Sequence, residues 1–129
     1  MTDVIVDTQA LIWHLVEPRK LGKSARRTLA AADSGTLLCH VPVIVLAEAA
    51  LLSERGRIRA GVQQVLASLA AHSGYAILSL DPEQCLEFAA LIGMKDPVVR
   101  LVAAAARVLR ARLISSDEVF DEHLDRIWD

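Results

Sequence analysis

Residues 4–13, VIVDTQALIW, decide the fold of this 129-residue chain. The first three form a β-branched run typical of a buried strand, and apolar residues at helical spacing follow from Ala10. An acid, Asp7, stands where the strand meets the helix. A helix N-cap explains Asp7 when it is taken alone. A corner of a metal-binding cluster explains it as well, provided that the rest of the chain supplies further acids.

Strand and helix patterns alternate along the rest of the sequence. Strands are predicted at 4–6, 37–41, 75–80 and 113–116, and helices at 8–14, 24–32, 42–54, 57–72, 82–92 and 97–110. The start of 42–54 is β-branched and also fits a strand, but its Ala- and Leu-rich second half favours a helix. A short helix or coil is predicted after residue 117. The alternation indicates an α/β fold, a three-layer α/β/α domain with a mostly parallel central sheet, and residues 1–129 are predicted to form one domain.

Composition limits the classes of function. The chain is 53% hydrophobic and 4% aromatic, with a net charge of −2, so a uniformly basic nucleic-acid surface is not expected. Cys39 and Cys85 lie among apolar neighbours and are expected to be buried thiols rather than a disulfide or a zinc site. We recognise no signal peptide, and the apolar stretches are too short to span a bilayer. A cytoplasmic protein without membrane contact is the expectation.

Acids recur at the positions where α/β proteins build their sites. Ligands bind beyond the carboxyl ends of parallel strands, and Asp7 and Asp117 follow the first and last predicted strands. Caps or turns explain each of them separately. Glu48 is the only charged residue between His40 and Glu54, and a solvated helix stripe explains it as well as a buried site does.

Asp96 precedes Pro97, which is ordinary chemistry for a helix start, and Asp81-Pro82 repeats the device. The coincidence of four acids carries more weight than any one of them. Hard cations such as Mg²⁺ and Mn²⁺ prefer oxygen ligands of this kind.

The order of these motifs resembles the PIN domain family, in particular the VapC-like ribonuclease toxins of type II toxin–antitoxin systems. VIVDTQALIWHL resembles the opening strand and first acid of the family, and VPVIVLAEAALL resembles the helix that carries its Glu. KDPVVRLVAAAARVLRARLISSDEVF resembles the stretch from an Asp-Pro pair through an Ala-rich helix and a strand to the final Asp. The terminal IW also fits, so the likeness covers nearly the whole chain.

The resemblance implies a Mg²⁺- or Mn²⁺-dependent endoribonuclease with a PIN-like fold. The acids that it assigns to catalysis and to metal binding are Asp7, Glu48, Asp96 and Asp117. It implies that RNA is the substrate, that a small antitoxin binds in a groove and inhibits the toxin, and that the toxin is a homodimer.

One position departs from the family pattern. The family has an acid two residues after the proline and directly before the Arg, and here Val99 occupies that place before Arg100. Asp96 matches the flanking acid of the family pair. The alternative function is therefore a catalytically weakened or inactive PIN-like protein that acts through partner or RNA binding. A hydrolase or phosphatase of another α/β family, using the same acids, is a third reading.

Two further residues are candidate substrate-binding groups. Arg100 lies beside the predicted site and is the best single candidate for holding a phosphate. The resemblance places a hydroxyl residue near Ser115, where it would orient a metal-bound water, and a backbone hydrogen bond at the strand end explains Ser115 equally well. The basic stretches 19–27 and 55–59 fit either a solvated face or RNA contact.

Overall fold

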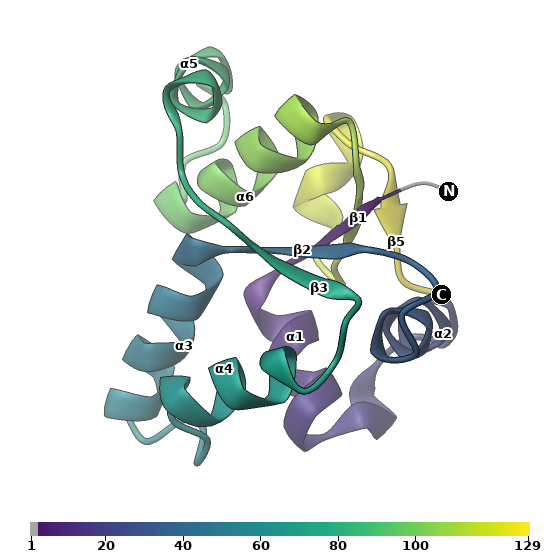
Figure 1. The fold of residues 1–129 in the computed structure, drawn as a ribbon. Coiled ribbons are helices and arrows are strands. Elements are labelled where there is room, and N and C mark those ends of the chain that lie inside the picture. Colours follow the sequence, from purple (N-terminus) through teal and green to yellow (C-terminus); the bar gives the residue numbers. More distant parts are fainter. Residues whose placement is uncertain (1–2) are drawn as a thin grey trace.

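The computed structural model describes residues 3–129, which form a parallel sheet between two groups of helices (Figure 1). The sheet has five strands in the order β3-β2-β1-β4-β5, and every neighbouring pair is parallel. The strands are β1 (Val4–Val6), β2 (Cys39–Pro42), β3 (Tyr75–Leu78), β4 (Arg112–Ile114) and β5 (Arg126–Ile127). The predicted α/β class with a mostly parallel sheet is confirmed.

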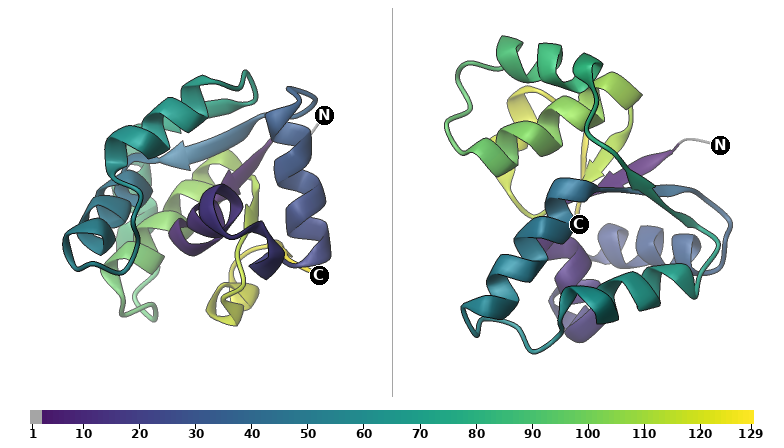
Figure 2. Two further views of the ribbon diagram at one scale, coloured as in Figure 1. Left: turned by 90° about the horizontal axis from the view of Figure 1, so that it is seen from below. Right: turned by 60° about the vertical axis from the view of Figure 1, so that its left-hand side comes forward.

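The helices cover both faces of the sheet. They are α1 (Thr8–Val16), α2 (Lys23–Asp33), α3 (Val43–Glu54), α4 (Val62–Ala70), α5 (Pro82–Ala90) and α6 (Pro97–Leu109), with the 3₁₀ turns η1 (Pro18–Lys20) and η2 (Glu118–Glu122). Figures 1 and 2 show α5 and α6 packed together on one side and α1 to α4 on the other. Right-handed crossovers require this separation, because the chain moves outward from β1 to β3 and then returns past β1 to β4.

The core is aliphatic, as the composition predicts. Val4, Ile5 and Val6 are covered on both faces of β1, and the Ala-rich stretch of α6, residues 103–106, is fully buried against the sheet. Small side chains let the α6 backbone approach the strands closely. This packing fixes the end of β1, and with it the start of α1, in a rigid frame. Within residues 3–129, none of the helices combines the length and the apolar character needed to cross a bilayer.

The structure differs from the sequence prediction at several element ends, most of all at α4, which begins at Val62 and not at Arg57. Two further differences follow from contacts near the C-terminal end. Gly22, and not Ser24, is the N-cap of α2, and the Ser24 hydroxyl instead donates to the carbonyl of Asp129 at 2.8 Å. The segment after Asp117 forms η2 and then β5, which pairs with β4, where a helix or coil was predicted. A two-residue strand carries no periodic signal, so only its pairing with β4 reveals β5.

Candidate acidic site at the ends of β1 and β4

The central strands β1 and β4 end side by side. Val6 pairs with Ile114, and the backbone N–H of Asp7 donates to the Ile114 carbonyl at 3.2 Å. The helix that follows β1 covers one face of the sheet and the helix that precedes β4 covers the other, so the crevice at their carboxyl ends lies at a topological switch point. Asp7 and Asp117 both lie at this edge, as the sequence predicts.

Asp7 is the N-cap of α1, and it also faces a cavity. Its Oδ1 accepts a hydrogen bond from the backbone N–H of Ala10 at 2.9 Å, so the cap interpretation is correct. Burial raises the pKa of Asp7 from 3.8 to about 6. Hydrogen bonds from Ser115 and Ala10 lower this pKa, and the negative charges of Asp117 and Glu48 raise it further. The surroundings of Asp7 therefore disfavour the negatively charged form of its carboxyl group.

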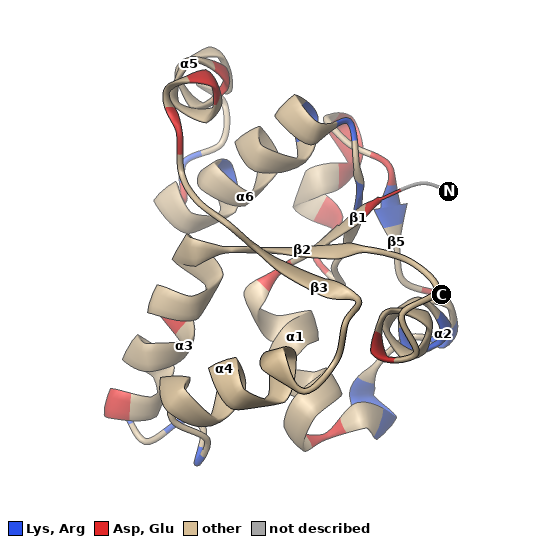
Figure 3. Ribbon diagram, viewed as in Figure 1, with Lys and Arg blue, Asp and Glu red and all other residues tan. Residues whose placement is uncertain are grey.

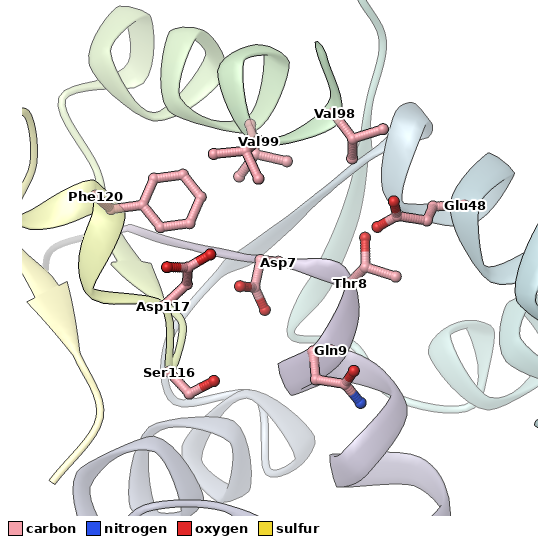
Figure 4. Close-up of a pocket in the computed structure, with 10 residues that line it drawn as sticks. Asp7, Thr8, Gln9, Glu48, Val98, Val99, Ser116, Asp117 and Phe120 are labelled. Carbon is pink, nitrogen blue, oxygen red and sulfur yellow. The ribbon is translucent and has the colours of Figure 1, made fainter. Parts of the chain in front are cut away.

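Asp7, Glu48 and Asp117 line the same cavity, of about 350 Å³ (Figure 4). Asp117 is exposed and caps η2 by accepting from the N–H of Val119 at 3.0 Å. Glu48 projects from the middle of α3, where charge is sparse (Figure 3). The full lining is Asp7, Thr8, Gln9, Glu48, Val98, Val99, Val102, Ser116, Asp117 and Phe120. Carboxylates from three distant segments thus face one space.

Asp96 lies next to this cavity and does not line it. It is exposed and caps α6, accepting hydrogen bonds from the N–H groups of Val98 and Val99 at 2.9 and 3.2 Å. It lines an adjoining cavity of about 370 Å³ together with Asp117 and Val99, which border both spaces. The cap interpretation of Asp96 is confirmed, and Asp117 and Val99 lie between its cavity and the cavity of the other three acids.

Val99 occupies the position of the missing acid and faces the site. Figure 4 shows its side chain over Asp7, beside Phe120. It is half-buried, packs against the core and borders both cavities. Its methyl groups form part of the apolar wall opposite the carboxylates. A carboxylate placed at this position would join the other acids.

Ser115 connects two of the acids. Its hydroxyl accepts from the backbone N–H of Asp117 at 3.0 Å and donates to the Asp7 carboxylate, and the residue is fully buried. Arg100 points away from the site: its Nε donates to the carbonyl of Phe88 at 2.8 Å, and its guanidinium lies 4.2 Å from the centre of the Phe88 ring. In this structure Arg100 connects α6 to the end of α5.

The oxygen donors suit a hard divalent cation. Among residues 3–129, no group of three or more His, Cys, Asp or Glu side chains already lies at the spacing of a metal site. Mg²⁺ needs no such group, because it keeps several waters and binds proteins through one or two carboxylates. Burial is the main cause of the raised pKa of Asp7, and the negative charges of Asp117 and Glu48 raise it further, so a cation bound between these carboxylates would stabilise their charged forms. The residues present fit Mg²⁺ or Mn²⁺.

Sequence reasoning missed several residues that line the cavity. Thr8 and Gln9 follow Asp7 directly, and Phe120 comes three residues after Asp117. Their nearness to the acids is a signal that could have identified them, since residues in the first turn after a strand end share its surroundings. Thr8 is the more informative, because its hydroxyl is buried and has no hydrogen-bond partner among the described residues.

The comparisons with known proteins agree with this geometry. The family model for the PIN domain matches residues 4–123, almost the entire chain. The chain belongs to the PIN domain family. No curated protein matches it.

Several solved structures that are similar to this chain are of toxins or toxin–antitoxin complexes. A structure of VapBC2 from Rickettsia felis, bound to a DNA fragment from its promoter, is similar over 99% of this chain and 100% of that one, with a TM-score of 0.74 and 16% identity. A toxin–antitoxin complex from Klebsiella pneumoniae is similar over 89% of this chain and 87% of that one, with a TM-score of 0.63 and 18% identity. VapC20 from Mycobacterium tuberculosis, a toxin that cleaves the sarcin–ricin loop, matches at 0.62 and 18% identity over 92% and 93%. These likenesses confirm the VapC-like fold.

Proposed function

We propose that this PIN domain is a metal-dependent endoribonuclease, a VapC-like toxin that hydrolyses RNA phosphodiester bonds in the cytoplasm and is neutralised by a cognate antitoxin. The proposal is carried by the arrangement of Asp7, Glu48 and Asp117 around one cavity at the ends of β1 and β4. Asp96 is the fourth acid of the proposed site, because it lines the adjoining cavity next to Asp117.

The three acids that line the cavity are the proposed metal ligands. Asp7 and Asp117, at the ends of two strands, would hold Mg²⁺ or Mn²⁺, and Glu48 would face the ion from α3. When bound, the ion supplies an activated water and neutralises charge on the scissile phosphate. Ser115 would orient the Asp7 carboxylate, since it hydrogen-bonds to that group and is anchored by the backbone N–H of Asp117.

Val99 supports one alternative, a PIN-like protein with weakened or no catalysis that acts through partner or RNA binding. It sets methyl groups where the family pattern has a carboxylate, and these face the cavity. Loss of one oxygen ligand weakens a site that depends on few protein ligands.

The direct test is cleavage of a labelled single-stranded RNA by the purified chain with Mn²⁺. We expect cleavage by the wild type and its loss in Asp7→Asn. Asp81→Asn is a matched control, because Asp81 is also a helix N-cap but caps α5 outside the cavity. The proposal fails if the wild type leaves RNA intact or if Asp7→Asn cleaves as well as the wild type. Hydrolysis of small phosphate esters without RNA cleavage would favour the third reading.

A second variant separates the active toxin from its weakened alternative. Val99→Asp should strengthen Mn²⁺ binding and raise the cleavage rate if the site is degenerate. An unchanged rate in an already active protein would indicate that Asp96 covers the role of the missing acid.

The antitoxin is proposed to bind a groove that adjoins the acidic cavity. This groove, of about 510 Å³, is lined by apolar side chains and by the cations Lys20, Arg57 and Arg59, and Gln9 lines both it and the acidic cavity. Its lining is Gln9, Ile12, Trp13, Val16, Glu17, Lys20, Leu52, Arg57, Ile58 and Arg59. Charge complementarity favours a partner segment with apolar and acidic side chains. A segment seated there would reach the acids through Gln9 and block them.

The homodimer is proposed to form through a different apolar surface, at the edge strand β3. Val43, Ile77 and Leu80 are 43%, 46% and 54% exposed, and Val43 and Leu80 border a small apolar cavity. An exposed apolar patch on a sheet edge favours association with a second copy.

One pair of variants tests both surfaces, each serving as the control for the other. Val16→Asp, in the lining of the groove, should abolish antitoxin binding and leave the oligomeric state unchanged. Leu80→Asp should produce monomers in light scattering and leave antitoxin binding intact. Antitoxin binding that survives Val16→Asp, or dimers that survive Leu80→Asp, would contradict the corresponding assignment.

A further inference from the structure

Thr8 is a buried hydroxyl residue without a hydrogen-bond partner, inside the proposed site. Its exposed fraction is 6%, and its Oγ1 finds no partner in residues 3–129. A buried polar group left unpaired destabilises a protein by about 1–3 kcal/mol. Native structures therefore keep few such groups, and each calls for an explanation. Packing does not explain why a threonine stands here, because a valine has nearly the same shape and the same branched Cβ without a hydroxyl.

The surroundings of Thr8 point to the acids. Thr8 follows Asp7 in the chain and lines the cavity with Glu48. Figure 4 shows Thr8 between the two acids, with its hydroxyl directed toward the Glu48 carboxylate. A carboxylate accepts hydrogen bonds and a hydroxyl donates one, so the two groups are chemically matched.

The acids also need a group that brings them together. No three acidic or His/Cys side chains in the described part of the chain have the spacing of a metal site, and Glu48 comes from α3 while Asp7 and Asp117 come from the strand ends. Metal-binding carboxylates are usually held by hydrogen bonds from residues that do not touch the ion. Ser115 performs this task for Asp7, since it hydrogen-bonds to the Asp7 carboxylate and is itself anchored by the backbone N–H of Asp117. Glu48 has no such partner among the hydrogen bonds of residues 3–129.

We propose that Thr8 is a positioning residue for Glu48: its hydroxyl donates a hydrogen bond to the Glu48 carboxylate when the site binds a divalent cation, and so sets that carboxylate toward Asp7. The inference deepens the proposed function and rests on it. The unpaired hydroxyl then lowers the stability of the metal-free chain, because its hydrogen bond forms only when a cation binds. Stability without metal and affinity for metal are therefore opposed at this residue.

The test compares Thr8→Val with Thr8→Ser in the full chain, using Mn²⁺ alone as the probe. Thr8→Val should weaken Mn²⁺ binding, measured by calorimetry, about tenfold or more. Without Mn²⁺ its unfolding temperature should equal or exceed that of the wild type, because an unpaired buried hydroxyl is removed. Thr8→Ser keeps the hydroxyl and should bind Mn²⁺ like the wild type.

The outcomes separate this inference from the proposed function. Equal Mn²⁺ affinity in the wild type and Thr8→Val overturns the inference and leaves the proposed function intact. A large loss of metal-free stability in Thr8→Val overturns it too, because the hydroxyl would then have a structural partner. A wild type that neither binds Mn²⁺ nor cleaves RNA overturns the proposed function, and the inference with it.

Discussion

At the scale of the residue, Asp7 affects stability in two opposite ways. Its side chain caps α1, which stabilises the fold, but its buried negative charge destabilises the fold. The pKa of Asp7 is about 6 in the folded chain, against an ordinary value of 3.8, and burial is the main cause. Between these values the folded state retains a proton that the unfolded state has lost. Stability should therefore fall as the pH rises from about 4 to about 6, and it should stay lower above that range.

Asp7→Asn should remove this pH dependence. Asn also caps helices well, so the hydrogen bond to Ala10 is retained. At pH 7.5 the variant should be more stable than the wild type by up to about 2–3 kcal/mol, and near pH 4 the two should unfold alike. Denaturant titrations at both pH values measure the difference. Asp81→Asn should not reproduce the effect, and a variant less stable than the wild type at pH 7.5 would refute this account of Asp7.

At the scale of the element, α5 depends on α6 for its attachment. Figure 2 shows α5 at the outside of the molecule against α6, and Arg100 of α6 donates to the end of α5 at the carbonyl of Phe88. The same side chain stacks on the Phe88 ring. These contacts account for Arg100 without RNA, although its place in the sequence made it the best candidate for holding a phosphate.

Arg100→Ala should therefore destabilise the chain by about 1–2 kcal/mol through the lost hydrogen bond and the lost ring contact. Hydrogen exchange should accelerate in α5 before it does in the central strands. RNA cleavage under conditions where the variant is folded should match the wild type. A selective loss of RNA affinity with unchanged stability would restore the phosphate-binding role.

Elements with long periodic patterns could be predicted from the sequence, and those that depend on pairing could not. The Ala-rich helix α6 follows from hydrophobic spacing, and the short buried strand β1 from its run of β-branched residues. The strand β5 exists only because β4 offers an edge, and the α2 cap moved to Gly22 because the Ser24 hydroxyl bonds to the chain terminus. Both depend on contacts between residues far apart in sequence.

At the scale of the whole molecule, the sheet brings the acids together. Parallel strands end at one edge, so Asp7 and Asp117 could be placed there from the sequence, and the structure adds Glu48 from α3 to the same cavity. The family resemblance already set Asp96 apart as the flanking acid of a pair, and the structure places it in the adjoining cavity. Thr8 had only its nearness to Asp7 as a sequence signal, because an unpaired buried hydroxyl is a property of packing.

The most direct test of the account is a crystal structure of the chain with Mn²⁺, located by its anomalous scattering. The account predicts one strong anomalous peak in the cavity at the ends of β1 and β4, within coordination distance of the carboxylates of Asp7 and Asp117 and with Glu48 turned toward it. A cavity without a peak at Mn²⁺ concentrations that support RNA cleavage, or a peak bound only elsewhere on the chain, would contradict it.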